Sequence, residues 1–210
     1  MVTGAGGSVG SELCRQLINL KPKLLILFEI NEYSLYKINR ELELICDEST
    51  RIFPILGSIR DSNRLKKICE NFNIQTIYHA AAYKHVPLVE HNNSEGILNN
   101  IIGTKVLAQI AMNSEVDTFV FISTDKAVRP TNIMGASKSL MEKLILSKKN
   151  KFRVSTARFA NVAFSNGSLL DGFIYRLNKK QPLSCPEDIK RFFVTPEQSG
   201  QICLLATFLG

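Results

Sequence analysis

Short apolar runs alternate with longer segments of helical periodicity along most of the chain. Helices are predicted where apolar residues recur at i, i+3 and i+4, namely at 11–20, 31–46, 62–72, 87–113 and 133–150. Buried strands are predicted where branched and aromatic residues cluster, at 24–29, 51–56, 76–81, 118–124 and 153–162. Strands that alternate with helices are joined by right-handed crossovers, and helices then cover both sheet faces. The sequence therefore predicts an α/β fold with a doubly wound parallel sheet.

Composition narrows the class of protein. With 210 residues, 45% of them hydrophobic, the chain is long enough for one α/β domain. The net charge of +7 suits nucleic acid, an anionic membrane surface or a phosphorylated small molecule alike. No nucleic-acid recognition motif accompanies it, so we expect no nucleic-acid partner. Apolar runs of strand length and the absence of a signal peptide predict a cytoplasmic chain without membrane contact. Five scattered cysteines without a CxxC motif predict neither disulfides nor a metal site.

A glycine-rich turn opens the chain, in the stretch TGAGGSVGSE at 3–12. Glycines at every third position let backbone N–H groups approach a pyrophosphate at the positive end of the following helix. Glu29 ends the next strand about 20 residues on, where a carboxylate accepts hydrogen bonds from an adenosine ribose and repels a 2′-phosphate. The pattern favours NAD over NADP, with the pyrophosphate held by Gly4, Gly7, Ser8, Val9 and Gly10.

Two loops at later strand ends extend this prediction. In GSIRD, at 57–61, Ser58 and Ile59 are placed to contact the adenine, although a plain turn is nearly as good an interpretation. The stretch HAAAYKHVP, at 79–87, offers three small residues beside the cofactor and then polar side chains over the carboxyl edge of the sheet, where ligands bind in open α/β folds. These residues are Ala80, Ala81, Ala82, Tyr83, Lys84 and His85.

Two further polar residues in this region have structural interpretations. His79 is predicted to be a strand-end histidine with its hydrogen bonds satisfied, because its spacing from other histidines fits no metal pattern. Asn100 lies within a predicted helix, where it would be an awkward buried group unless it bonded to backbone or water. We therefore interpret Asn100 as a structural bridge.

The stretch STDKAVRPTNIMGASK, at 123–138, carries the candidate catalytic residues. Thr124, Asp125 and Lys126 follow the fifth predicted strand, and the next helix places Met134 and Lys138 on one face. Hydroxyl, carboxylate and ammonium groups in one cleft can perform acid/base chemistry if each tunes the pKa of the others. A surface ion pair and a solvated helix lysine are the structural alternatives. Met134 is notable because a thioether cannot transfer a proton.

At this point the sequence resembles the extended short-chain dehydrogenase/reductases. More narrowly, it resembles the polysaccharide-biosynthesis UDP-N-acetylglucosamine 4,6-dehydratases, in the branch with Met in place of the catalytic Tyr. The likeness spans nearly the whole chain and rests on TGAGGSVGSEL, AAAYKHVPLVE, NNIIGTK, STDKAVRPTNIMGASK, RFANVAFSNGS and RFFVTPE. It implies a Rossmann fold, with residues 1–163 as the NAD-binding domain and 164–210 as the start of substrate-binding segments with a returning strand and helix.

The resemblance also implies an internal redox cycle. NAD takes hydride from carbon 4 of the sugar, water leaves across carbons 5 and 6, and the hydride returns to carbon 6. Carried over, Thr124 bonds the carbon 4 oxygen, Asp125 and Lys126 handle protons at carbons 5 and 6, and Lys138 holds the nicotinamide ribose. With no phenol at position 134, a water or a neighbouring acid is expected to take the carbon 4 hydroxyl proton, and Tyr83 and Asp125 are the nearest candidates by sequence. The UDP-sugar is expected to contact Lys84, His85, Arg158, Asn161, Ser165, Asn166 and Arg191. Ser165 and Asn166 fit equally well as plain turn residues.

Other interpretations remain open at the level of sequence. A nucleotide-sugar epimerase, or a dehydratase for another sugar, would share every cofactor motif. A catalytically silent NAD-binding regulatory or scaffold module is also consistent with Met134. Both ends of the sequence look truncated, because only Met1 and Val2 precede the glycine turn where a strand of about five residues is expected. We expect a homo-oligomer, and the resemblance leaves open a membrane anchor in the parent protein.

Overall fold

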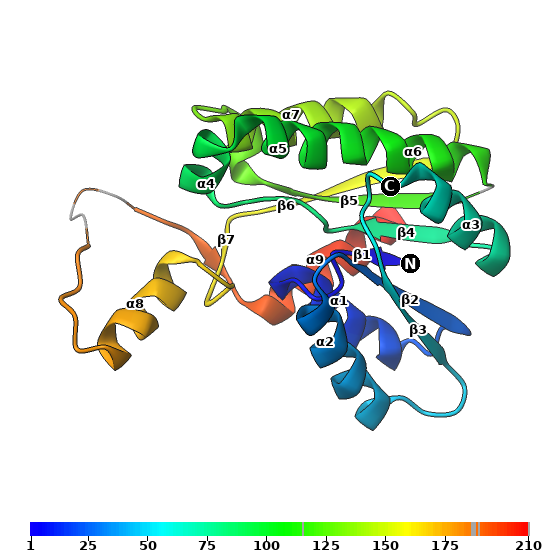
Figure 1. Ribbon diagram of the computed structural model, residues 1–210, viewed down its shortest axis with the longest axis horizontal. Helices are drawn as coiled ribbons and strands as arrows, with labels where there is room; N and C mark the ends of the chain where they lie inside the picture. The colour runs from blue at the N-terminus through cyan, green and yellow to red at the C-terminus, as the bar shows by residue number, and fades with distance from the viewer. Residues whose placement is uncertain (115, 186–187, 189, 210) are drawn as a thin grey trace.

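Six parallel strands form the main sheet of the protein (Figure 1). The computed structural model describes residues 1–114, 116–185, 188 and 190–209. The strand order is β3-β2-β1-β4-β5-β6. Successive strands are added on one side of β1 up to β3 and on its other side from β4 on, so the predicted doubly wound sheet is confirmed. The strands are β1 (Val2–Thr3), β2 (Leu24–Glu29), β3 (Arg51–Leu56), β4 (Thr76–His79), β5 (Thr118–Thr124) and β6 (Arg153–Phe159).

The sheet has a core on each face, because successive side chains of a strand point to opposite sides. In β2, Leu25 and Leu27 belong to one buried cluster, whereas Ile26 and Phe28 belong to the other. Strand β5 alternates in the same way. Burial on both faces explains why these strands are continuous apolar runs in the sequence.

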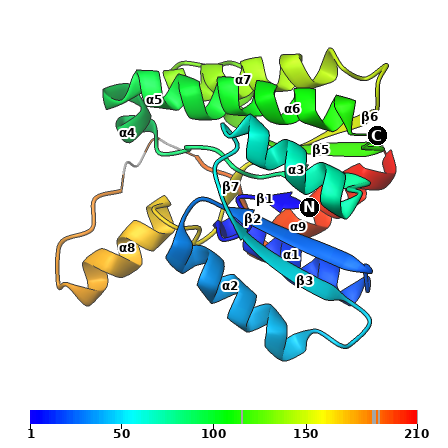
Figure 2. The ribbon, with the colours of Figure 1, turned by 45° about the vertical axis from the view of Figure 1, so that its right-hand side comes forward.

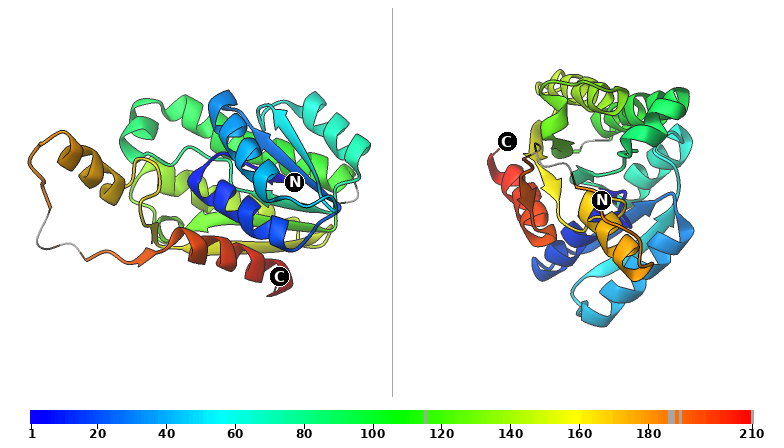
Figure 3. Two further views of the ribbon diagram at one scale, coloured as in Figure 1. Left: turned by 90° about the horizontal axis from the view of Figure 1, so that it is seen from below. Right: turned by 90° about the vertical axis from the view of Figure 1, so that its left-hand side faces the viewer.

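Helices cover both faces of the sheet, and Figure 2 and the right-hand view of Figure 3 show the two layers. One face carries α3 (Ser62–Phe72), α6 (Gly103–Asn113) and α7 (Ile133–Leu146). The other carries α1 (Ser8–Asn19), α2 (Glu32–Ile45) and α9 (Pro196–Leu209). Among the described residues, no helix combines the length and apolar character needed to cross a membrane.

The single helix predicted for 87–113 is wrong, because the structure divides this segment into four consecutive pieces. The first piece ends at His91, because the next residue, Asn92, has a non-helical backbone with φ of −128° and ψ of 50°. A π-helical turn then adds a residue per turn and buries both Asn99 and Asn100. The pieces are α4 (Val86–His91), α5 (Asn93–Ile97), the π-turn η1 (Leu98–Ile102) and α6.

The predicted strand at 153–162 is also divided. Its end leaves the main sheet and, as β7 (Asn161–Val162), pairs in parallel with β8 (Phe193–Val194) in a separate two-stranded sheet. Between them α8 (Leu169–Asn178) stands away from the main sheet in Figures 1 and 3, and it contains no buried residue. Helix α9 then returns to pack on α1 and on β5 and β6. The predicted boundary between an NAD-binding domain at 1–163 and substrate-binding segments at 164–210 stays a prediction.

His79 links the centre of the sheet to the helix layer. Its ring is fully buried and lies 2.7 Å from the Thr3 hydroxyl and 2.8 Å from the Thr104 hydroxyl. The prediction of a strand-end histidine with satisfied hydrogen bonds is therefore confirmed. Burial, assisted by the charge of Lys138, lowers the pKa of His79 to about 3. The imidazole is thus neutral in the folded protein.

This burial predicts a pH dependence of stability. Below pH 6.5 the unfolded chain binds a proton at His79 that the folded chain does not, so the free energy of unfolding should fall with falling pH. The contribution approaches about 1.4 kcal/mol per pH unit and continues down to pH of about 3. In urea titrations between pH 5 and 7, His79→Gln should flatten this dependence, and His91→Gln on the exposed side of α4 should leave it unchanged. Equal slopes in all three proteins would contradict the assignment.

Candidate active site

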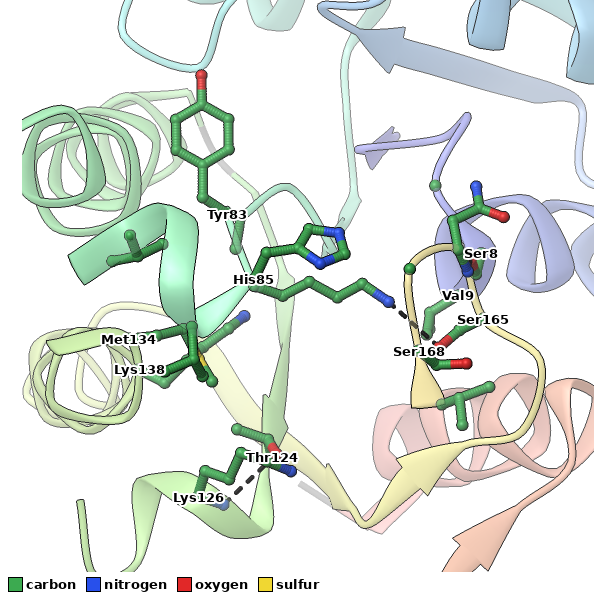
Figure 4. Close-up of a pocket in the computed structure, with 18 of the residues that line it drawn as sticks. Ser8, Val9, Tyr83, His85, Thr124, Lys126, Met134, Lys138, Ser165 and Ser168 are labelled. Atoms are coloured by element: carbon green, nitrogen blue, oxygen red, sulfur yellow. Dashed lines mark hydrogen bonds between the residues drawn. The ribbon is translucent and has the colours of Figure 1, made fainter. Parts of the chain in front are cut away.

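A cleft of about 800 Å³ lies at the carboxyl ends of the central strands. Figure 4 shows Met134 and Lys138 on one side of it, Ser8, Val9 and Ser165 on the other, and Thr124 at its base. Predicted site residues that line the cleft are Gly4, Gly7, Ser8, Val9, Gly10, Ala80, Ala82, Lys84, His85, Thr124, Lys126, Met134, Lys138, Asn161 and Ser165.

The three regularly spaced glycines of the opening turn have different roles. Gly4 has a φ of +70°, a left-handed conformation that favours glycine. A Cβ on Gly10 would lie 2.0 Å from the Gly4 carbonyl oxygen, so α1 packs on the turn through this residue. A Cβ on Gly7 would meet just the Gly4 oxygen within 4 Å, at 3.3 Å. Gly7 therefore leaves space on the side of the cleft.

The amino terminus of α1 is open toward this space. Gly7 is its N-cap and supplies no side-chain hydrogen bond, unlike the asparagine and aspartate caps of α2 and α3. An uncapped helix start presents N–H groups and a partial positive charge, which together bind phosphate groups. The geometry of the turn thus fits a pyrophosphate.

Glu29 lies behind the glycine turn and outside the cleft lining. Its carboxylate accepts hydrogen bonds from the backbone N–H groups of Gly6 at 3.0 Å, Ile30 at 2.9 Å and Asn31 at 3.0 Å. The carboxylate is 8% exposed and is therefore fixed in orientation at the end of β2. Its predicted contact with an adenosine ribose remains a prediction.

The predicted adenine contacts and Ala81 also lie outside the cleft lining. Ile59 is buried, and a Cβ on Gly103 would lie 2.7 Å from its Cδ1 atom, so Ile59 packs on α6. The Ser58 hydroxyl accepts a hydrogen bond from the backbone N–H of Arg60 at 3.2 Å. Ala81 packs its backbone on Gly4. Ile59 and Ala81 thus pack on neighbouring segments and Ser58 closes a local turn, and the contact of these residues with a cofactor stays a prediction.

Asp125 connects the polar groups at the base of the cleft. Its Oδ1 atom accepts hydrogen bonds from the Thr124 hydroxyl at 2.8 Å and from Lys126 Nζ at 3.1 Å. Lys126 Nζ also lies 3.4 Å from Asn161 Oδ1. Partial burial would raise the pKa of Asp125, but the hydrogen bonds from Thr124 and Lys126 outweigh it and lower the pKa. Asp125 itself lies outside the cleft lining, behind Thr124 and Lys126.

Met134 and Lys138 form the apolar and cationic side of the cleft. Both are buried on α7, with 4% and 7% exposure. Lys138 Nζ donates to the Ile122 carbonyl oxygen at 2.9 Å and lies 4.9 Å from the centre of the Phe121 ring. Burial lowers the pKa of Lys138 to about 8, against the opposing effect of Glu142. A buried ammonium therefore faces the cleft beside a side chain that cannot exchange protons.

The segment 164–168 bridges the two sides of the cleft. Lys84 Nζ donates to the Ser165 hydroxyl at 3.2 Å, and the backbone N–H of Asn166 donates to the Ser8 hydroxyl at 3.0 Å. His85 packs on Gly167, where a Cβ would lie 2.1 Å from its ring. Burial is the main cause that lowers the pKa of Lys84, and the charge of Lys126 adds to it.

Asn100 supports the loop that carries these residues. Its side-chain oxygen accepts from the Tyr83 N–H at 2.8 Å, and its side-chain nitrogen donates to the Tyr83 carbonyl and the Ser137 hydroxyl, each at 3.0 Å. The interpretation of Asn100 as a structural bridge is confirmed. It fixes the loop at 80–85 against α7.

One of the two predicted arginine contacts differs from expectation, and several residues that line the cleft were not predicted. The prediction that Arg158 faces the UDP-sugar is wrong, because its guanidinium pairs with Glu142. Arg191 is exposed and lies outside the cleft lining, so its predicted substrate contact stays a prediction. Sequence reasoning missed Asn92 and Glu95, which line the cleft from the interrupted helix region. The position of this segment directly after AAAYKHVP was the available signal.

Comparisons with known proteins identify the family to which this sequence is similar. The family model described as "Polysaccharide biosynthesis protein" matches residues 1–210. The capsular polysaccharide biosynthesis protein CapD of Staphylococcus aureus is 39% identical over 100% of this chain and 36% of its own length. The inverting UDP-N-acetylglucosamine 4,6-dehydratase of Campylobacter jejuni is 30% identical over 97% of this chain and 61% of its own.

A solved structure supports the fold independently. The X-ray structure of Pen from Bacillus thuringiensis superposes with a TM-score of 0.90 at 29% identity, covering 100% of this chain and 64% of Pen. The chain thus spans between about a third and two thirds of these relatives. Its sheet is a Rossmann sheet of the extended short-chain dehydrogenase/reductase type. With a family model that matches its full length, the chain belongs to the polysaccharide biosynthesis protein family.

Proposed function

We propose that this chain is the NAD-binding catalytic part of a nucleotide-sugar 4,6-dehydratase that acts on UDP-N-acetylglucosamine. The observation that carries the proposal is that two chemistries meet at one cleft: an uncapped helix start on one side, and Thr124 and Lys126 at the base with Asp125 behind them. The dehydratase from Campylobacter jejuni supports the substrate assignment. The volume of about 800 Å³ is in the range of small-molecule sites.

The residues of the glycine turn would hold the pyrophosphate of NAD, and Glu29 would face its adenosine ribose. Lys138 would contact the nicotinamide ribose from the opposite side. When bound, NAD supplies this site with a reversible hydride acceptor. Lys84, His85, Asn161, Ser165 and Arg191 are the proposed contacts of the UDP-sugar, and the ammonium groups of Lys84 and Lys126 give the cleft a positive charge that suits a diphosphate.

Asp125 is our candidate for the proton route that a tyrosine usually supplies. The Thr124 hydroxyl already donates to Asp125, so a sugar hydroxyl that donates to Thr124 can pass its proton along this pair to the carboxylate. Figure 4 shows the other candidate, Tyr83, with its hydroxyl directed away from Thr124 and Lys126. The geometry therefore favours Asp125 over Tyr83.

The remaining steps need a base and an acid near carbons 5 and 6. Oxidation at carbon 4 would acidify the carbon 5 proton. Asp125 would give the proton that it received from the carbon 4 hydroxyl to the departing carbon 6 hydroxyl, which leaves as water, and its carboxylate, held by Lys126, would accept the carbon 5 proton. NAD, when bound, would supply the hydride that reduces carbon 6, and Asp125 would return its proton to carbon 5. Met134 contributes an apolar wall, and Lys138 stabilises negative charge that develops on the carbon 4 oxygen.

The first experiment tests the reaction itself. The chain is incubated with NAD and UDP-N-acetylglucosamine, and mass spectrometry should detect a nucleotide sugar lighter by one water. Asp125→Asn should slow its formation by about 10²- to 10⁴-fold, whereas Tyr83→Phe should change it by less than about threefold. A large effect of Tyr83→Phe without one of Asp125→Asn would reverse the proton assignment. A product of unchanged mass with an inverted carbon 4 would replace the dehydratase by an epimerase.

The glycine turn gives a prediction that requires no turnover. Gly7→Ala should fold normally, because its Cβ meets just one atom, but should weaken NAD binding by roughly tenfold or more in calorimetry, because the methyl group occupies pyrophosphate space. Gly10→Ala should instead lower the free energy of unfolding by about 1–3 kcal/mol, because its Cβ overlaps the Gly4 oxygen. Unchanged NAD affinity in Gly7→Ala would contradict the placement of the cofactor.

A further inference from the structure

A buried carboxylate lies one helical turn beyond Lys138 and takes no part in the chemistry above. Glu142 is 3% exposed, and it follows Lys138 by four positions on α7, so both side chains occupy one helix face. An ionised carboxylate is rarely buried unless it is paired, because burial removes its hydration. Glu142 therefore requires a structural or functional reason.

Arg158 is the direct partner of Glu142. Its Nε atom donates to Glu142 Oε1 at 2.7 Å, and its terminal nitrogen donates to the other carboxylate oxygen. Arg158 stands on β6 opposite Ser123 of β5, the residue before Thr124. Burial would raise the pKa of Glu142, but Arg158, the Ser123 hydroxyl and the charge of Lys138 outweigh it and lower the pKa. Glu142 is thus an anion fixed directly behind the catalytic strand end.

The surroundings of Lys138 show what this anion does. From β5, the Phe121 ring and the Ile122 carbonyl face the ammonium, and from β4 the neutral His79 does so. On α7 itself, Glu142 opposes the loss of the proton that burial favours. Arg158 on β6 fixes and partly offsets the negative charge of Glu142. Among the charged groups in the described part of the chain, Glu142 is the one that acts to keep Lys138 charged.

We propose that Glu142 is a positioning residue that keeps the Lys138 ammonium charged at the cleft, with Arg158 holding its carboxylate in place. The consequence for catalysis rests on the proposed function, in which a charged Lys138 contacts the nicotinamide ribose and stabilises the carbon 4 oxyanion. Without Glu142, burial would leave a larger fraction of Lys138 neutral near physiological pH. The Glu142–Arg158 pair therefore sets the upper pH limit of the site.

The test follows the titration of Lys138 directly. Lysine carries a ¹³C label at Cε, Lys138→Met identifies the signal, and its chemical shift is followed from pH 6 to 11. Glu142→Gln should move the Lys138 midpoint down by about one pH unit. Arg158→Gln breaks the same ion pair but leaves the carboxylate charge unshielded, so the midpoint should move up. A purely structural pair would give no shift, or shifts of one sign, and either result would overturn the proposal.

A double variant protects the test from misfolding. Glu142→Gln with Arg158→Gln leaves no unpaired buried charge, so it should fold, and its Lys138 midpoint should still lie below that of the unmodified chain. An unchanged midpoint in this variant would also overturn the proposal. The titration needs neither NAD nor sugar, so a chain without turnover that still shows the opposite shifts would contradict the proposed function and leave the role of Glu142 standing. In an active chain, the alkaline limb of kcat/KM should move with the midpoint.

Discussion

The close packing of α1 on the opening turn is the contact on which the cleft depends. Gly10 lets the helix approach the Gly4 carbonyl, and Gly4 in turn approaches the backbone of Ala81 at the end of β4. These contacts place the uncapped start of α1 where the strand order reverses. Because the strands are parallel, the chemistry that follows β4 and β5 reaches the same place.

A few ionised groups set the charge in and beside the cleft. Asp125 accepts hydrogen bonds from Thr124 and Lys126, so one carboxylate orients a hydroxyl and an ammonium. Lys138 is buried beside Met134 and relies on Glu142 for a counter-charge. In the proposed mechanism, the Thr124–Asp125 pair takes the proton that a tyrosine would otherwise take, and the apolar Met134 places no competing acid beside the Lys138 ammonium.

The sequence predicted the features that depend on local pattern. Alternating runs predicted the sheet, the glycine spacing predicted the turn, and the position of His79 predicted a satisfied strand-end histidine. The sequence pattern did not predict two other features, the partner of Arg158 and the π-turn. Arg158 was predicted to contact the substrate. Its ion pair with Glu142 could not be predicted from the sequence, because the pair forms only when α7 packs over β5 and β6. The π-turn was missed because apolar spacing does not reveal one extra residue in a turn.

The proposed reaction returns to carbon 6 the hydride that is removed from carbon 4. The direct test supplies UDP-N-acetylglucosamine with deuterium at carbon 4 together with unlabelled NAD, and locates the label in the product by NMR and mass spectrometry. The dehydrated product should retain the deuterium, now at carbon 6, with no accumulation of reduced cofactor. Loss of deuterium to solvent, or a stoichiometric yield of reduced NAD, would contradict it.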